Sequence, residues 1–375
     1  MESATRWRMR TWSKRSCFDA LTIGLGIGAG IVYLYDNSQK VLAATLTVFG
    51  VGAVSIHWRR AARIAIRSNH AVVITGCDSG LGYSLAHHCR ALNATVIAGV
   101  LQPEGLGARE LLRNGVKVVP LDVTRAESVG EFGNKVRDIV RQENLVFRTL
   151  VNNAGVMTFG EFEWQTEEQT RRQVDVNLLG TMRVTKDLMP LMRSMGSRII
   201  FVSSHCSFEP LPGVATYAAT KAAISAWATA LRVEVSKYGI DVVCFIPGSF
   251  TQESNILAKQ SDHFEAMNSS MTEEAKNFYG DYLKRYEQYL TGMSREMLPR
   301  MLQQPNLYHQ FDRALMDDCT RAVYKCEPWR YTFYHLLFWL SPTYIRDRLV
   351  ERFMMMPRWK ATDSLSTPDR EVRVK

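Results

Sequence analysis

The sequence lacks the paired cysteines that disulfide frameworks and zinc sites require. Its seven cysteines are an odd number, are scattered along 375 residues and include no C-x-x-C pair. Disulfide-rich domains and structural zinc sites instead place their cysteines at short, regular spacings. We therefore exclude a disulfide scaffold, predict no metal site, and expect the main domain to face a reducing compartment.

The last 305 residues also lack the charge excess of a nucleic-acid-binding protein. Of the net charge of +9, residues 1–70 carry +7, because ten Lys and Arg side chains there are accompanied by only three acidic ones. A nucleic-acid-binding domain spreads its basic residues over a folded face. Here the basic excess flanks two apolar runs, which points to a membrane as partner and excludes a nucleic acid.

These two apolar runs lie close together at the amino terminus. Residues 20–35 carry no charge, and residues 41–58 contain His57 as their one ionisable side chain. A membrane-spanning helix needs about 20 apolar residues, with about 17 as the lower limit. Glycines at G-x-x-x-G spacing in the first run would let two helices approach closely in lipid. We predict a transmembrane helical hairpin within a membrane anchor at residues 1–69.

Basic side chains at both outer ends of the hairpin predict its orientation. Five precede the first run and four follow the second, whereas the connecting turn has one Lys. By the positive-inside rule, residues 70–375 lie on the cytoplasmic side of the membrane. We expect the endoplasmic reticulum, with the mitochondrion as alternative because the Arg-rich residues 1–16 also resemble a targeting presequence. A buried soluble hairpin is the third interpretation.

From His70 onward, short β-branched runs alternate with longer helical stretches. This alternation predicts an α/β fold, a Rossmann-type doubly wound parallel sheet with helices on both faces. The main domain is expected at 70–360 and a polar tail at 361–375. Strands are expected at 71–75, 95–100, 116–121, 149–152, 198–203 and 241–246, with a last one at 330–335. Helices are expected at 81–92, 126–141, 167–195 and 216–238, with a further helical region at 251–303.

A glycine-rich turn follows the first expected strand and opens a helix. It reads Thr75-Gly76-Cys77-Asp78-Ser79-Gly80-Leu81-Gly82. Glycines permit a tight turn and let backbone N–H groups approach a pyrophosphate, while the helix amino terminus attracts the anion. The strand before and the helix after it make the motif informative. We predict dinucleotide contacts from Gly76, Asp78, Ser79, Gly80, Leu81 and Gly82.

The end of the second strand decides between the two nicotinamide dinucleotides. Residues 98–102 contain no acid that would hold a ribose diol, and residues 95–108 contain no Lys or Arg that would bind a 2′-phosphate. Asp78 in the glycine turn would repel such a phosphate. The balance favours NAD as cofactor, with NADP as the alternative.

Further motifs follow the glycine turn in a fixed order and spacing. They are Asn152-Asn153-Ala154-Gly155, Asn177, Ser204 thirteen residues before Tyr217, Tyr217-x-x-x-Lys221 and Pro247-Gly248. A single Y-x-x-x-K occurs on many helices, so the specificity lies in the combination. Over about residues 70–250 these motifs resemble the short-chain dehydrogenase/reductase family.

The residue types suit the transfer of a hydride and a proton. A phenol with a pKa near 10 is a poor base unaided, and the ammonium of Lys221, one helical turn from Tyr217, favours the tyrosinate. The resemblance implies that Lys221 also binds the nicotinamide ribose and that Ser204 orients the substrate oxygen. It further implies that Asn177 holds a proton-relaying water. It assigns additional cofactor contacts to Asp122, Asn152, Ala154, Gly155, Tyr217, Lys221, Pro247 and Gly248.

Three segments (75–80, 152–161 and 176–181) are similar to one branch of the family. That branch contains retinol dehydrogenases, hydroxysteroid dehydrogenases and D-3-hydroxybutyrate dehydrogenase. The resemblance implies an NAD(H)-dependent oxidoreductase that interconverts a lipophilic alcohol, steroid-like or retinoid-like, and its carbonyl. The longer amino-terminal segment and residues 247–252 depart from the branch pattern, which leaves the substrate mouth open.

Two other functions stay open. D-3-Hydroxybutyrate has a carboxylate that needs a cationic partner, and no such residue is evident in the sequence. A catalytically silent membrane scaffold would have no need of Asn177, Ser204, Tyr217 and Lys221 together. A homo-oligomer is a possible assembly.

Two segments beyond the motifs bear on substrate and membrane. Residues 249–303 are rich in Met and aromatic residues and are expected to form a substrate lid. Residues 336–340, followed by Arg346, Arg348 and Arg352, fit either an amphipathic helix on the bilayer or a docked carboxyl-terminal helix.

Overall fold

A computed structural model describes residues 63–248, 255–291, 298–327, 329–354 and 356–364. The predicted transmembrane helices at 20–35 and 41–58 lie outside these residues. Within the described ranges, no helix is both long enough and apolar enough to cross a bilayer.

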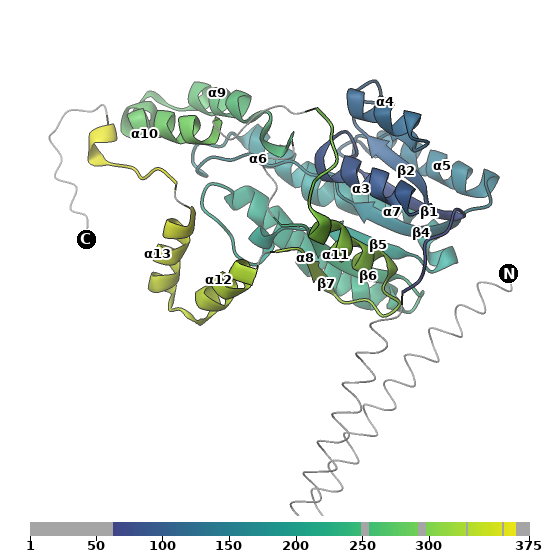
Figure 1. The fold of residues 1–375 in the computed structure, drawn as a ribbon. Helices are drawn as coiled ribbons and strands as arrows, with labels where there is room; N and C mark the ends of the chain where they lie inside the picture. The colour runs from purple at the N-terminus through teal and green to yellow at the C-terminus, as the bar shows by residue number, and fades with distance from the viewer. Residues whose placement is uncertain (1–62, 249–254, 292–297, 328, 355, 365–375) are drawn as a thin grey trace, which may run out of the picture.

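A seven-stranded sheet, parallel throughout, forms the centre of the molecule (Figure 1). The strand order is β3-β2-β1-β4-β5-β6-β7, so the direction of strand addition reverses between β1 and β4. In such sheets ligands bind beyond the carboxyl ends of the strands at this reversal. The strands are β1 (His70–Thr75), β2 (Thr95–Val100), β3 (Lys117–Pro120), β4 (Val146–Asn152), β5 (Arg198–Val202), β6 (Asp241–Ile246) and β7 (Val323–Lys325).

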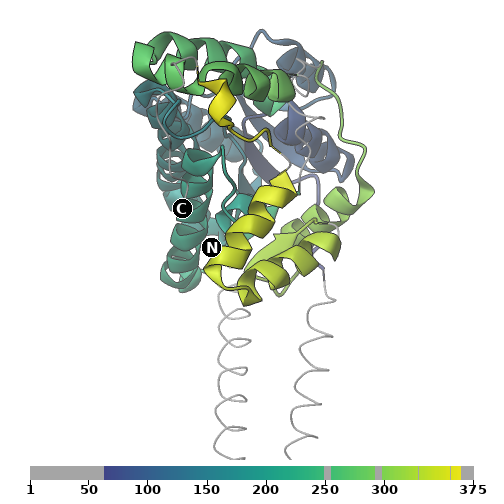
Figure 2. The same cartoon turned by 90° about the vertical axis from the view of Figure 1, so that its left-hand side faces the viewer.

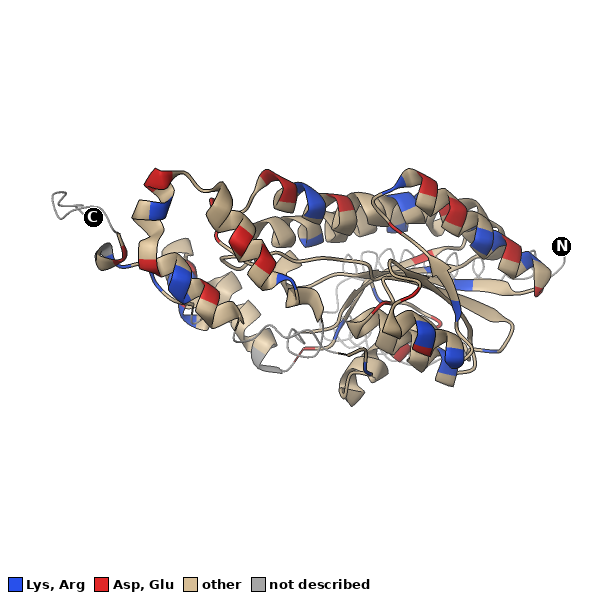
Figure 3. Ribbon diagram, turned by 90° about the horizontal axis from the view of Figure 1, so that it is seen from above, with Lys and Arg blue, Asp and Glu red and all other residues tan. Residues whose placement is uncertain are grey.

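Helices cover both faces of the sheet, as the sequence predicts (Figure 3). Alternate residues of each strand face opposite sides, so Val72 packs in one core and Val73 in the other. One face is covered by α3 (Gly80–Ala91), α4 (Leu106–Arg113) and α11 (Pro305–Met316). The other is covered by α5 (Ala126–Gln142), α7 (Thr181–Met195) and α8 (Ala215–Ser236).

The long helix predicted at 167–195 is continuous but contains a wider turn. It consists of α6 (Glu167–Val174), a π-helical segment η1 (Asp175–Gly180) and α7. A capping box between Thr166 and Gln169 fixes its start. π-Turns are rare and occur often at functional sites. Here the turn contains Asn177, one of the predicted catalytic residues.

The strand predicted at 330–335 is wrong, because these residues belong to helix α12 (Trp329–Leu340). Tyr334 and Phe338 lie one helical turn apart, and both rings contact Phe353 of α13 (Thr343–Met354), with centroid distances of 4.9 and 6.3 Å. The aromatic spacing therefore serves helix packing and not a strand. The last strand is instead β7, which is only three residues long.

The region predicted as a substrate lid, 249–303, is helical where it is described. It contains η4 (Asn255–Leu257), α9 (Gln260–Ser270) and α10 (Glu273–Thr291), seen together in Figure 2. Met267 and Tyr279 pack with Trp164 in a separate aromatic cluster. Of its described residues, Asn255 and Ile256 line the main cavity described below.

Arg198, the first residue of β5, is a buried cation that joins the sheet to α11. Its guanidinium donates to the carbonyl oxygens of Ala314 (2.9 Å) and Asp317 (2.6 Å) and pairs with the Asp241 carboxylate (3.2 Å). Its removal takes the buried donor away from the two carbonyl oxygens.

We expect Arg198→Ala to lower the free energy of unfolding by about 3–5 kcal/mol, because breaking a buried ion pair leaves its partners uncompensated. Urea denaturation of the full chain in mild detergent measures this change. Arg141→Ala is the control, since the Arg141 side chain is 78% exposed and pairs with Asp138 at the surface. Similar losses in both variants would contradict the assigned role of Arg198.

Candidate active site

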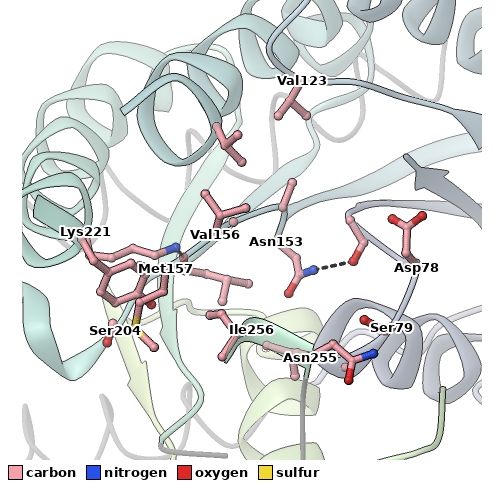
Figure 4. A pocket seen from close by; sticks show the side chains of 18 of the residues that line it. Asp78, Ser79, Val123, Asn153, Val156, Met157, Ser204, Lys221, Asn255 and Ile256 are labelled. Atoms are coloured by element: carbon pink, nitrogen blue, oxygen red, sulfur yellow. Dashed lines mark hydrogen bonds between the residues drawn. The ribbon is translucent and has the colours of Figure 1, made fainter. Parts of the chain in front are cut away.

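Hydrogen bonds join the loop after β1 to the loop after β4. The Thr75 hydroxyl accepts from the N–H groups of Asn153 and Ala154, each at 3.0 Å. The Asn153 side-chain amide donates to the carbonyl oxygens of Thr75 (2.9 Å) and Gly76 (3.0 Å). These four bonds set the spacing between the two loops at the point where the strand order reverses. Figure 4 shows a bond from the Asn153 side chain.

The glycine turn requires glycine for two separate reasons. Gly76 and Gly80 have φ values of +69° and +59°, in the left-handed region that favours glycine. A Cβ at position 82 would lie 2.1 Å from the Gly76 carbonyl oxygen and 2.5 Å from the Asn153 side-chain nitrogen. Helix α3 therefore packs directly against the turn. Its amino terminus, at Ser79 and Gly80, opens on the cavity.

A cavity of about 340 Å³ extends from the glycine turn to helix α8. In Figure 4, Asp78 and Ser79 lie at one end, Ser204 and Lys221 at the other, and Asn153 and Val156 between them. Most of the predicted site residues line this cavity. They are Gly76, Asp78, Ser79, Gly80, Leu81, Asp122, Ala154, Gly155, Ser204, Tyr217, Lys221, Pro247 and Gly248.

Three predicted site residues do not line the cavity. Gly82 lies behind the turn, and Asn152 is buried, with its side-chain amide donating to the Thr185 hydroxyl at 3.0 Å. Its neighbour Asn153 lines the wall instead. Asn152 is the last residue of β4, and its side chain is directed toward Thr185 of α7 and not toward the cavity.

Asn177 is fully buried behind the cavity wall. Its side-chain oxygen accepts from the Val156 N–H at 2.8 Å, and its amide donates to the Val156 carbonyl (2.9 Å) and the Thr220 hydroxyl (3.1 Å). The side chain thus ties the loop after β4 to helix α8, which carries Tyr217. Its predicted role in holding a water stays a prediction.

Tyr217, Lys221 and Ser204 meet at the far end of the cavity. Tyr217 and Lys221 share one face of α8, with the Lys221 nitrogen 5.7 Å from the centre of the Tyr217 ring. The ammonium donates to the Val202 carbonyl at the end of β5, at 2.9 Å. Ser204 follows β5, accepts from the Cys206 N–H at 3.2 Å, and lies near enough to Tyr217 to affect its ionisation.

Burial dominates the ionisation of this group. It raises the pKa of Tyr217, an effect to which nearby Cys206 adds, while the Ser204 side chain lowers that pKa. Burial also lowers the pKa of Lys221 to about 8. The sequence predicts that the Lys221 ammonium favours the tyrosinate and so lowers the pKa of Tyr217. In the protein without cofactor, desolvation of the phenol has the larger effect and raises that pKa.

Asp78 reaches across to the end of β2. Its carboxylate oxygens accept from the backbone N–H groups of Leu101 (3.0 Å) and Gln102 (2.8 Å). The glycine turn thereby supplies an acid at the strand end where the sequence itself has none. Spacing along the chain cannot reveal this, because Asp78 precedes Gln102 by 24 residues.

Asp122, after β3, lines the same end of the cavity. Burial pushes its pKa upward, but hydrogen bonds from Thr124, at 2.9 and 2.7 Å, together with nearby Arg172 and Arg125, lower that pKa overall. The carboxylate is therefore held charged and fixed in direction.

The wall around the Tyr217 end is mainly apolar. Met157, Cys206 and Ile256 line it, and none of the three is evident from the motifs. Behind them lies a cluster that includes Leu211, Val214, Leu257, Phe338 and Val350. Helices α12 and α13, far away in the sequence, thus contribute to the packing around Tyr217.

The chain matches the family model described as short chain dehydrogenase over residues 70–263. It therefore belongs to the short-chain dehydrogenase family.

Three relatives differ in the substrate that their names give. Estradiol 17-beta-dehydrogenase 2 of Rattus norvegicus is 37% identical over 237 residues, which are 60% of this chain and 60% of that protein. Retinol dehydrogenase 7 of Rattus norvegicus is 30% identical over 74% of this chain and 87% of its own length. The mitochondrial D-beta-hydroxybutyrate dehydrogenase of Bos taurus is 30% identical over 71% and 81%.

The match spans less than two thirds of the estradiol dehydrogenases from rat and mouse, at 60% and 61% of their lengths.

Among solved structures, a short-chain dehydrogenase from Streptomyces avermitilis has a TM-score of 0.53 and 23% identity, over 76% of this chain and 97% of that chain. This likeness supports the fold.

We expect Gly82→Ala to lower the free energy of unfolding by about 1–3 kcal/mol, because the added methyl overlaps the Gly76 backbone. Gly130→Ala in α5 is the matched control, since a Cβ there meets nothing within 4 Å. The control should be neutral or stabilising by about 0.5–1 kcal/mol. Denaturation curves of both variants test this, and a neutral Gly82→Ala would contradict the close packing of α3.

Proposed function

We propose that the chain is an NAD(H)-dependent oxidoreductase that interconverts a lipophilic alcohol and its carbonyl. The observation that carries this proposal is the single cavity shared by Ser204, Tyr217, Lys221 and the glycine turn. Family membership and the dehydrogenase names of all three relatives support it.

The residues present fit a nicotinamide dinucleotide. Gly76 to Leu81 and the amino terminus of α3 would hold the pyrophosphate, because backbone N–H groups and the helix dipole attract an anion there. Asp122 and Asp78 would contact the adenosine half, and Lys221 would bind the nicotinamide ribose. When bound, this cofactor supplies the carbon that accepts or gives the hydride.

The proton is the part of the reaction that the chain itself would handle. In oxidation, Tyr217 takes the proton from the hydroxyl group of the alcohol, and the carbon that bears this hydroxyl loses a hydride. Ser204 orients the hydroxyl oxygen of the alcohol. Because burial raises the pKa of Tyr217, a positive charge must lie near the phenol for it to act as a base. The Lys221 ammonium and an oxidised nicotinamide would supply that charge.

The chemistry of the wall supports a neutral, lipophilic substrate. Among the described residues that line the cavity, the basic ones are Arg172, His205 and Lys221. Arg172 lies near Asp122, Lys221 donates to Val202, and burial lowers the pKa of His205 to about 4, so His205 is neutral at pH 7. A hydroxybutyrate carboxylate would find no dedicated cation among these described residues, which favours a steroid-like or retinoid-like alcohol.

The position of Asp78 supports NAD over NADP. Dinucleotide-binding folds read the ribose hydroxyls with an acid at the end of the second strand. The Asp78 carboxylate lies there, bound to the Leu101 and Gln102 N–H groups, and each oxygen keeps a lone pair for a ribose hydroxyl. A 2′-phosphate at the same place would meet a like charge.

The proposed location is a membrane with the catalytic domain on its cytoplasmic side. The support is the predicted anchor at residues 1–69 and the basic residues that flank its apolar runs. We favour the endoplasmic reticulum; the mitochondrion is the alternative, and the bovine relative carries that location in its name.

We expect Tyr217→Phe to abolish turnover and to keep cofactor binding, because it removes one hydroxyl and little volume. NADH formation by the full chain, measured with estradiol, retinol and D-3-hydroxybutyrate, tests this. Turnover of hydroxybutyrate alone would replace the substrate proposal. Tight NAD binding without turnover of any substrate would favour the scaffold, and an active Tyr217→Phe would contradict the mechanism.

We expect the unaltered chain to prefer NAD over NADP. Asp78→Asn should lower the ratio of kcat/KM with NAD to kcat/KM with NADP by at least about tenfold. The reason is that repulsion between the Asp78 carboxylate and a 2′-phosphate is worth about 1.4 kcal/mol or more at such a site. Asn keeps the shape and can still accept one backbone N–H. The ratio of kcat/KM with NAD and with NADP gives the result. An unchanged ratio would show that another residue selects the cofactor.

A further inference from the structure

The turn between α12 and α13 exposes a group of large apolar side chains. Trp339 is 79% exposed, Leu340 64%, Tyr344 69% and Ile345 50%. Phe333 and Leu336 extend this surface along α12 at helical spacing. Soluble surfaces seldom gather side chains of this size, and such a patch marks a contact with a partner or a membrane. We name these six residues the α12–α13 patch.

The charges around the patch favour a lipid surface. From Trp329 to Arg346 the chain has no acidic residue, and Arg348 stacks over the Tyr344 ring at 4.9 Å. Trp and Tyr are enriched at membrane interfaces, where Arg side chains can reach the phosphate groups. A helical turn with Trp, Leu and Ile at its tip and Arg beside it therefore matches an interfacial anchor.

The opposite face of the same helices packs toward the catalytic residues. Phe338 is 4% exposed and belongs to the cluster that contains Tyr217. Arg346 of α13 pairs with Glu209, in the segment after Ser204, at 3.4 Å. The α12–α13 pair thus connects the exposed patch with the substrate end of the cavity.

The position of the patch agrees with a membrane contact. Figures 1 and 2 show the α12–α13 turn on the lower side of the molecule. The described chain begins at Arg63 on the same side, where Arg63 pairs with Asp317. A chain that leaves a bilayer before Arg63 would hold this side toward the lipid.

We propose that the α12–α13 patch inserts into the surface of a bilayer that contains anionic lipid and holds the substrate end of the cavity at that surface. The part of this inference that concerns the substrate rests on the proposed function. The part that concerns membrane contact rests on the exposed residues and does not depend on that function. Interfacial helices bury their apolar face about 5–10 Å into the boundary between headgroups and acyl chains.

A spin label at position 340 tests the proposal in the full chain. Leu340→Cys is compared with Leu112→Cys, because Leu112 is also exposed, at 53%, and belongs to α4, which Figure 1 shows on the upper side of the molecule, away from α12 and α13. Cys17 and Cys319 are changed to Ser in both variants. The other cysteines, Cys77, Cys89, Cys206, Cys244 and Cys326, are buried. Each variant is reconstituted in phosphatidylcholine–phosphatidylserine vesicles and its accessibility to oxygen and to a water-soluble nickel complex is measured.

We expect the label at 340 to gain access to oxygen and lose access to nickel, while the label at 112 remains in water. Equal access to nickel at both positions would overturn the proposal. Strong dipolar coupling between labels at 340, without immersion, would also overturn it and assign the patch to a contact between two copies of the chain.

The label reports on membrane contact whether or not the protein turns over a substrate, so a failure of the proposed function is distinguishable from a failure of this inference. If both hold, Leu340→Glu should raise the KM for a bilayer-dissolved alcohol severalfold and leave its kcat unchanged, because Leu340 does not line the cavity. An unchanged KM would separate the patch from substrate delivery and contradict that part of the proposal.

Discussion

The interaction on which the site depends is the set of four hydrogen bonds between Thr75-Gly76 and Asn153-Ala154. These bonds join the loops after β1 and β4, where the strand order reverses and the two loops would otherwise separate. The connection continues beyond them, since the Asn177 side chain accepts from the Val156 N–H and donates to the Thr220 hydroxyl of α8. One continuous network of contacts therefore runs from the glycine turn to α8.

Desolvation gives the cavity its chemical character. Burial raises the pKa of Tyr217 and lowers that of Lys221, so it disfavours the charged form of both groups. A site of this kind is poised for proton transfer only when further positive charge is brought to it. That requirement couples the proposed chemistry to cofactor binding.

The sheet and most of the site are predictable because each rests on local signals. Strand runs, the glycine turn and the Tyr217–Lys221 spacing all lie within short segments. Contacts between distant segments are not predictable in this way: Asp78 reaches Gln102, and α12 packs beside Tyr217. The strand predicted at 330–335 failed for the same reason, because its aromatic residues pack against α13 and tertiary contacts outweigh local preference.

A structure of the full chain with NAD and a steroid alcohol bound tests the central claim most directly. The account predicts that the alcohol oxygen lies within hydrogen-bond distance of both the Tyr217 and Ser204 hydroxyls, about 2.6–3.2 Å, with the reacting carbon facing the nicotinamide. A nicotinamide ring outside this end of the cavity, or an alcohol oxygen beyond the reach of Tyr217, would contradict it.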